Sequence, residues 1–282
     1  MSLAPADFDY VRTLVRDEAA IVVEPGKSYL VESRLAPVAR RHGLQTIDRL
    51  VQQLRRGSPR LRDEVVEAMT TNETSFFRDV HPFTSLEERV IPELMQRRAA
   101  RRQLVFWSAA CSSGQEPYSV AMLLREKFPQ LASWNVRIVA SDISAEMLGR
   151  AAAGRFSQLE VNRGLPARYL AKYFQREGAE WQISDEIRRM VEFRAVNLIQ
   201  PWPRMPPVDV LLLRNVLIYF DHGTKREILA RCRQTLQPDG FLFLGAPETT
   251  LNVDPAFDRV QHGQTICYQL KSATGTGQGC TK

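Results

Sequence analysis

The chain has 282 residues, of which 44% are hydrophobic and 25% are charged, and its formal net charge is +6. These values are typical of a globular protein with a buried core and exclude disordered and fibrous chains. No apolar run approaches the ~20 residues that span a bilayer, and the N-terminal segment carries acids where a secretory signal would be basic. We therefore expect a cytoplasmic protein that does not insert into a membrane. The positive charge suits an acidic partner, and nucleic acid is the first candidate to consider.

The cysteines carry no sign of a disulfide framework or of a metal site. They are scattered along the chain without a CxxC pair and without a histidine at ligand spacing, at Cys111, Cys232, Cys267 and Cys280. This pattern predicts free thiols in a reducing compartment and no bound metal.

The N-terminal part of the chain has the pattern of a small helical domain. Four segments place apolar residues three to four positions apart, with charges between them, over residues 8–20, 27–44, 46–57 and 59–70. Pro25-Gly26, Gly43 and Gly57 separate these segments. We predict an all-helical domain over residues 1–80.

The stretch MTTNETSFFRD, Met69 to Asp79, fits neither a helix interior nor a plain surface loop. Short hydroxyl and amide side chains compete for the backbone hydrogen bonds of a helix. A surface loop, in turn, would not contain two adjacent phenylalanines. A helix end with two core phenylalanines explains the aromatic pair but not the density of polar side chains around it.

From residue 102 onward, short β-rich runs alternate with helical segments. The runs over 103–110, 136–144, 190–198, 208–220 and 241–248 are separated by helical patterns such as 116–128 and 224–240. This alternation predicts a Rossmann-like α/β domain over residues 81–271, with a mostly parallel sheet and helices on both faces. The final run, 257–270, reads as a hairpin around His262-Gly263 that adds antiparallel edge strands.

Two segments depart from this alternation. Between about residues 160 and 192 we predict a small antiparallel β-subdomain insert, with short strands in EWQIS (180–184) and EIRRMVEF (186–193). Inserts of this kind usually carry specificity rather than core chemistry. The last residues, 272–282, are rich in glycine, serine and threonine and are predicted to form a disordered tail.

The first strand-to-helix turn has the features of a cofactor-binding turn. Small residues over 109–114 would let a ligand approach the backbone, and Pro117 suits the first turn of the following helix. The turn lacks the GxGxxG pattern, which favours a cofactor without a pyrophosphate. Small residues at such a turn can also serve tight packing alone.

Polar side chains stand at three further strand ends. Asp142 follows the second strand, where an acid commonly accepts the ribose hydroxyls of an adenosine. The alternative is that Asp142 or Ser144 caps the next helix. Asn197 and Asn215 end later strands and would suit an adenine edge or an amino-acid head group, although each could equally form an Asx turn.

Taken in order, the motifs TTNETSFFRD, WSAACSSGQEPYS, ASDIS, VNL and RNVLIYFD resemble the chemotaxis receptor glutamate methyltransferases, the CheR family. The resemblance covers nearly the whole chain. It implies an S-adenosylmethionine (SAM) dependent enzyme that methylates glutamate side chains of chemoreceptors to glutamyl 5-O-methyl esters and releases S-adenosylhomocysteine (SAH).

By the same resemblance, each motif supplies residues to one site. Asn72, Thr74 and Arg78 would close over the cofactor. Glu116 would hold its amino-acid end and Asp142 its ribose. The residues implied on the adenosine side are Asn197, Leu198, Asn215 and Val216, and those nearest the transferred methyl are Arg78 and Tyr219. Tyr219 could also be an ordinary half-buried strand tyrosine. The stretch 69–79 then becomes the connection between the domains, with Phe76 and Phe77 anchored in the interdomain core.

The resemblance also suggests how the substrate is recognised. Arg34, Arg40 and Arg41 would form a basic surface that docks the cytoplasmic helical bundle of chemoreceptors, continued by Arg55, Arg56, Arg60 and Arg62. A simple solvated face is the alternative. Family members that dock a C-terminal receptor peptide carry a glycine-rich loop in the β-subdomain, whereas this insert has only Gly178. We therefore predict direct recognition of the methylation helices, by a monomer.

Three other functions are weaker fits. A nucleic-acid methyltransferase would share the fold and charge, but such enzymes usually carry an Asn/Asp-Pro-Pro-aromatic step where this chain has RNVLIYF. We therefore expect no nucleic-acid partner. The complete set of polar residues argues against a non-catalytic adaptor, and the missing glycine fingerprint argues against an NAD-dependent oxidoreductase.

Overall fold

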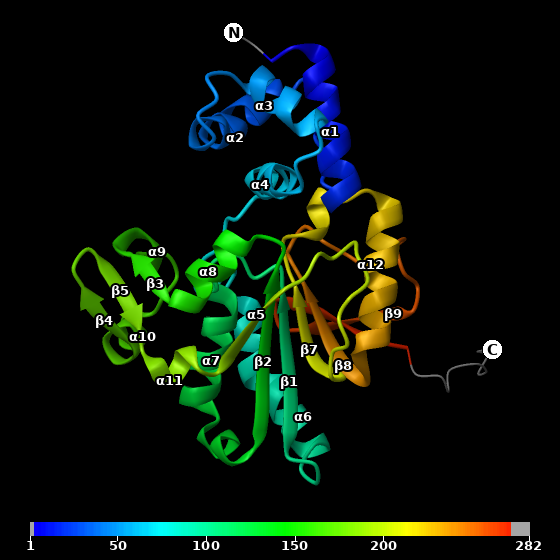
Figure 1. Ribbon diagram of the computed structural model, residues 1–282. Coiled ribbons are helices and arrows are strands. Elements are labelled where there is room, and N and C mark those ends of the chain that lie inside the picture. The colour runs from blue at the N-terminus through cyan, green and yellow to red at the C-terminus, as the bar shows by residue number, and fades with distance from the viewer. Residues whose placement is uncertain (1–2, 272–282) are drawn as a thin grey trace, which may run out of the picture.

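The computed structural model describes residues 3–271, which form a small helical domain above a larger α/β domain (Figure 1). The predicted all-helical domain is confirmed. Thr46 and Ser58 cap the third and fourth helices, since their side chains accept hydrogen bonds from Arg49 N–H and Leu61 N–H. The four helices are α1 (Pro5–Ala19), α2 (Ser28–Arg41), α3 (Ile47–Arg55) and α4 (Pro59–Met69).

The α/β domain is built on a seven-stranded sheet with the order β6-β2-β1-β7-β8-β10-β9. The pairs among β6, β2, β1, β7 and β8 are parallel, and β10 pairs antiparallel with both β8 and β9. The predicted mostly parallel sheet and the terminal hairpin are therefore confirmed. The strands are β1 (Gln103–Ala109), β2 (Asn135–Asp142), β6 (Val191–Ala195), β7 (Val208–Leu213), β8 (Leu236–Leu244), β9 (Phe257–His262) and β10 (Thr265–Leu270).

Helices cover both faces of this sheet, as predicted. Successive side chains of a strand point to opposite faces, so Phe106 joins one core cluster and Trp107 the other. Both faces are thus buried, which explains why the central strands are almost continuously apolar. The helices and short turns of this domain are α5 (His81–Ser85), η1 (Leu86–Val90), α6 (Ile91–Arg97), α7 (Gln115–Lys127), η2 (Pro129–Ser133), α8 (Ala145–Ala153), η3 (Leu217–Tyr219) and α12 (His222–Thr235).

The predicted β-subdomain insert is present, but its boundaries and one of its strands differ from the prediction. It begins at Arg155 rather than at about residue 160, because β3 (Arg155–Ser157) pairs with β5 (Glu180–Ile183), which also pairs with β4 (Phe174–Glu177). The second predicted strand is wrong. Its first half is α11 (Asp185–Arg188), and its second half is main-sheet strand β6. Two further helices complete the insert, α9 (Gln158–Asn162) and α10 (Ala167–Tyr173).

Phe76 and Phe77 do not lie in a core between the two domains, so that expectation is wrong. Both belong to the core cluster of the α/β domain, which contains no residue of the helical domain. Phe76 contacts the insert through Phe156 and Phe174. The helical core instead ends at Met69. The packing therefore places the change of domain between Met69 and Phe76, rather than at residue 80.

Within residues 3–271, no helix combines the length and the apolar character needed to cross a membrane. The same residues contain no group of three or more His, Cys, Asp or Glu side chains that could hold a metal ion. Cys111, Cys232 and Cys267 are free and buried. Cys280 and the predicted disordered tail, residues 272–282, lie outside the described residues.

The packing of Phe76 yields the first prediction. Its ring is fully buried and makes edge contacts with Phe156 at 5.0 Å and Phe174 at 5.7 Å between centroids. We expect Phe76→Ala to lower the free energy of unfolding by about 3–5 kcal/mol, measured by urea denaturation. The control Leu159→Ala, at a side chain that is 78% exposed, should stay within about 0.5 kcal/mol of wild type. A Phe76→Ala loss as small as that of the control would contradict the anchoring role.

Candidate functional site

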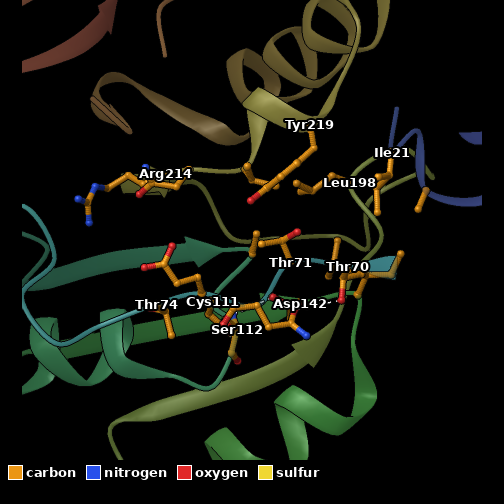
Figure 2. Close-up of a pocket in the computed structure, with 18 of the residues that line it drawn as sticks. Ile21, Thr70, Thr71, Thr74, Cys111, Ser112, Asp142, Leu198, Arg214 and Tyr219 are labelled. Atoms are coloured by element: carbon orange, nitrogen blue, oxygen red, sulfur yellow. Dashed lines mark hydrogen bonds between the residues drawn. The ribbon is translucent and has the colours of Figure 1, made fainter. Parts of the chain in front are cut away.

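The candidate site is a pocket at the carboxyl ends of four parallel strands, β1, β2, β6 and β7. The chain runs outward from β1 through β2 to β6 and then returns to place β7 on the other side of β1. Ligands of open α/β sheets bind at this reversal of strand order. The lining residues surround about 960 Å³ of empty space, part of which is open to solvent. Figure 2 shows Tyr219 and Leu198 on one side of it and Asp142 and Ser112 on the other.

The structure brings all the predicted site residues together in this pocket. They come from the interdomain stretch and from the ends of β1, β2, β6 and β7, and they are Asn72, Thr74, Arg78, Glu116, Asp142, Asn197, Leu198, Asn215, Val216 and Tyr219. Their individual roles remain predictions. Ser112, from the small-residue turn predicted to admit a ligand, also lines the pocket, as does its neighbour Cys111. Lining residues that the sequence reasoning missed include Ile21, Thr70, Thr71, Ile143, Arg214 and Phe220.

The turn after β1 is held in an unusual backbone conformation. Ala110 and Ser112 have positive φ values of 58° and 50°, and Gly114, the N-cap of α7, has φ 92°. A Cβ at Gly114 would lie 2.9 Å from the Cβ of Ala151, so glycine is required by both conformation and space. Non-glycine residues with such φ values persist only where surrounding contacts hold them, and they cluster at functional sites.

Asp142 provides one of the contacts that hold this turn. Its carboxylate accepts the backbone N–H of Ser112 at 2.8 Å and that of Ser144 at 2.9 Å. Burial raises the pKa of Asp142, while these backbone donors act in the opposite direction. The helix cap is a separate group, since the Ser144 hydroxyl accepts the Met147 N–H. Asp142 therefore joins the β1 and β2 turns and is not the N-cap of α8.

Glu116 forms a buried ion pair that the sequence reasoning did not anticipate. One carboxylate oxygen accepts the Ser108 hydroxyl at 2.7 Å, and the other accepts Arg214 Nη1 at 2.8 Å. Arg214 also donates from Nη2 to Asp79 at 2.7 Å and to the carbonyl of Arg78 at 2.9 Å. Its side chain is 1% exposed. The sequence did contain one sign of this ion pair. An arginine directly after a buried strand is itself expected to be buried, and a buried charge needs partners.

Arg78 and Tyr219 line the pocket from two different segments, Arg78 from the interdomain stretch and Tyr219 from η3 after β7. Arg78 donates from Nη1 to the Glu73 carbonyl at 2.9 Å, and its side chain is 26% exposed. The carbonyl of Tyr219 accepts the N–H of Val22, which follows α1, at 3.2 Å. Both residues are partly exposed, and their contact with a ligand remains a prediction.

For Asn197, the structure shows the Asx turn that the sequence had left open. Its Oδ1 accepts the Ile199 N–H at 3.1 Å, while its Nδ2 donates to the carbonyl of Glu18 in α1 at 2.7 Å. The amide thus connects the sheet to the helical domain at the pocket wall. A direct contact of this side chain with a cofactor remains a prediction.

Asn215 is held by a buried carboxylate that the sequence reasoning missed. Glu248 accepts the N–H groups of Asn215 at 2.8 Å, Gly245 at 2.6 Å and Ile218 at 3.2 Å. Asn215 itself has φ 59°. A Cβ at Gly245 would meet Asn215 Nδ2 at 2.6 Å. Glu248 therefore fixes the segment that leads from Asn215 to Tyr219.

The interdomain stretch, residues 69–79, lines the pocket and is held from both sides. Ser112 donates its hydroxyl to the Asn72 carbonyl at 2.8 Å. From α2, Arg34 donates to the carbonyls of Met69 and Thr70. Arg34 is half-buried, so its predicted place on an exposed basic surface is wrong.

The other two arginines of the predicted basic surface lie where the sequence placed them. Arg40 and Arg41, near the C-terminal end of α2, are both exposed. Arg41 Nη2 lies 3.8 Å from Oε2 of Glu64 in α4. The contact with chemoreceptors that we predicted for this surface remains untested by the structure.

Comparison with known proteins identifies both domains. Residues 6–70 match the family described as "CheR methyltransferase, all-alpha domain", and residues 72–266 match "CheR methyltransferase, SAM binding domain". The chain is 43% identical to "Chemotaxis protein methyltransferase 1" of Pseudomonas aeruginosa and 40% identical to "Chemotaxis protein methyltransferase Cher2" of Pseudomonas putida. In both cases the alignment covers 96% of this chain and 100% of the relative.

Solved structures that resemble the chain are more distant. The magnesium protoporphyrin IX methyltransferase of Synechocystis with bound SAM is 15% identical, with a TM-score of 0.37, over 72% of this chain and 87% of that one. This similarity is too low to inform the site.

The buried ion pair of Arg214 yields the second prediction. Arg214→Met leaves the buried Glu116 without its cation, and we expect a loss of about 3–5 kcal/mol in the free energy of unfolding. The matched control is Arg125→Ala, which breaks the ion pair with Glu186 whose side chains are 38% and 51% exposed. That variant should lose less than about 1 kcal/mol. Equal losses in urea denaturation would contradict a special role for the buried pair.

Proposed function

The chain belongs to the CheR methyltransferase family, and we propose that it transfers a methyl group from SAM to glutamate side chains of chemoreceptors. The products would be glutamyl 5-O-methyl esters and SAH, formed in the cytoplasm. The observation that carries this proposal is that ten residues from separate motifs line one pocket at the switch point of the sheet. The curated relatives are named as chemotaxis protein methyltransferases, which supports the same pathway.

The residues of the pocket fit the chemistry of SAM in three regions. The buried carboxylate of Asp142 suits ribose hydroxyls, because its oxygens have lone pairs beyond those that accept Ser112 and Ser144. Ile143, Leu198 and Val216 provide apolar contacts for an adenine. Glu116 and Arg214 place one negative and one positive group where a zwitterionic amino acid would need both. No metal is needed for any of these roles.

The acceptor needs no general base. A glutamate side chain has an unperturbed pKa of about 4.3 and is ionised at neutral pH. When bound, SAM supplies an electrophilic methyl group on a sulfonium. The protein's contribution is then to align the carboxylate, which is worth about 7–11 kcal/mol in well-oriented systems. This agrees with a pocket whose lining contains no histidine.

Arg78 and Tyr219 are the residues we propose to orient the acceptor. The reaction neutralises a positive and a negative charge, so a tight bidentate grip on the carboxylate would stabilise the ground state and slow the reaction. Arg78 already donates to the Glu73 carbonyl and lies 3.7 Å from the Glu73 carboxylate. Part of its hydrogen-bonding capacity is therefore in use, which favours single contact with an acceptor oxygen. The Tyr219 hydroxyl would provide the second contact.

Receptor docking is proposed for the exposed part of the basic helical surface. Several of its arginines are paired within the domain, Arg55 with Asp7, Arg60 with Glu64 and Arg62 with Glu18. The remaining positive charge is concentrated at the exposed Arg40 and Arg56, together with the exposed Arg41, which shares Glu64 with Arg60. Association of a monomer with an acidic helical bundle through this surface should weaken as salt increases.

The test of the proposed function is transfer of tritium from methyl-labelled SAM to membranes that contain the host's chemoreceptors. We expect label that mild base releases as a volatile product, because base hydrolyses esters and spares N-methyl groups. Arg78→Ala should lower this transfer about 100-fold through loss of alignment. Arg101→Ala, at an exposed arginine outside the pocket, is the control and should retain full activity. Label that resists base, or that appears on nucleic acid, would disprove the proposed substrate.

We further propose that recognition does not depend on a receptor's C-terminal peptide. The β4–β5 hairpin pairs Glu177 with Glu180, so only Gly178 and Ala179 form its turn. A turn of two residues leaves no room for a glycine-rich docking loop.

A calorimetric titration of the protein with a receptor C-terminal pentapeptide checks this proposal. We expect no saturable heat, whereas a parallel titration with SAH should saturate and show that the protein is competent. Tight peptide binding would contradict direct recognition of the methylation helices.

A further inference from the structure

Arg34 projects from the helical domain onto the stretch that lines the pocket. Its guanidinium donates from Nη1 to the carbonyls of Met69 at 2.5 Å and Thr70 at 2.7 Å, and from Nη2 to the Thr71 hydroxyl at 2.9 Å. Thr70 and Thr71 both line the pocket (Figure 2). Burial lowers the pKa of Arg34, and the nearby Tyr219 acts in the opposite direction. This arginine therefore lies beside the site rather than on an open docking face.

The contacts of Arg34 use the geometry of a guanidinium rather than its charge alone. Three acceptors on consecutive residues are held by two terminal nitrogens of one planar group. A lysine would place a single ammonium on a flexible stem and could not reproduce this fork. The stretch it holds leads directly to Asn72, whose side chain accepts the Thr70 hydroxyl at 3.1 Å.

Other contacts connect the helical domain to the segments that form the pocket. Glu67 of α4 accepts the Ser144 hydroxyl at 2.5 Å and the Glu146 N–H at 2.7 Å. These groups begin helix α8, directly after Asp142. On the opposite side, Asn197 reaches the Glu18 carbonyl. The position of the helical domain and the shape of the pocket are therefore linked at several points.

We propose that Arg34 is a positioning residue for methyl-donor binding: it holds residues 69–71 so that Asn72 and Thr74 face the pocket. The proposal rests on the proposed function for the identity of the donor. It assigns different roles to arginines on one helix. Arg34 acts through the stretch on the cofactor site, while the exposed Arg41, two helical turns further on, has only surface contacts.

The test is calorimetric titration of the full chain with SAH in the absence of any receptor. We expect Arg34→Ala and Arg34→Lys both to weaken SAH binding by about tenfold or more, which corresponds to ~1.4 kcal/mol. The control Arg41→Ala, on the same face of α2, should bind SAH within about twofold of wild type, or ~0.4 kcal/mol. Circular dichroism and thermal unfolding of each variant establish that it is folded.

Arg34→Lys is the decisive variant, because it keeps the charge and would be folded even where Arg34→Ala is not. In methyl-transfer assays it should raise KM for SAM and leave kcat at saturating SAM largely unchanged, without a matching rise in KM for the receptor. Wild-type affinity for SAH in Arg34→Lys would overturn the positioning role. Failure of the wild-type protein itself to bind SAH would instead overturn the proposed function, and this inference with it.

Discussion

The site depends on one buried guanidinium. Arg214 follows a central strand and pairs with Glu116 at the start of α7, with Asp79 and with the carbonyl of Arg78. Burying such a charge is costly unless every partner is well placed, so the group is stable only when these three segments meet. Its position therefore sets the distance between the strand end that carries Asn215 and the segment that carries Arg78. A single interaction thus aligns the two walls between which a methyl donor would lie.

The backbone around this ion pair is strained, and polar groups hold it. Positive φ values occur at Phe77 and Asp79 beside Arg78, at Ser112 after β1 and at Asn215 after β7. Each such residue costs on the order of 1–3 kcal/mol. The compensation is specific, since Ser119 accepts the Phe77 N–H, Asp142 accepts that of Ser112, and Glu248 accepts that of Asn215. The strained backbone lowers the free energy of unfolding, and these hydrogen bonds hold it in the conformation that shapes the pocket.

Local patterns in the sequence predict the sheet, the helical domain and the polar residues at the strand ends, because hydrophobic period and strand ends are local properties. Asp142 could be found in this way. The other site residues, such as Asn72 and Arg78, were implied by the resemblance to a family. The partners that hold the site could not be found in either way. Glu248 lies 33 residues from Asn215 and Arg34 lies 36 residues from Thr70. Nothing near either residue in the chain indicates such a contact. The misassigned strand at 186–193 failed differently, because its apolar spacing fitted a short helix and a strand equally well.

The helical domain makes direct contacts with residues at and next to the pocket. Charge pattern groups Arg34 with Arg40 and Arg41, but contacts separate them, since only Arg34 turns inward to the stretch above the pocket. Glu67 and Asn197 form two further contacts between the helical domain and the α/β domain beside the site. A substrate bound at the exposed end of α2 would thus contact the same helix that, through Arg34, holds residues 69–71 beside the pocket. If both proposed roles hold, recognition and methyl-donor binding share that helix, and a change in its position would alter both.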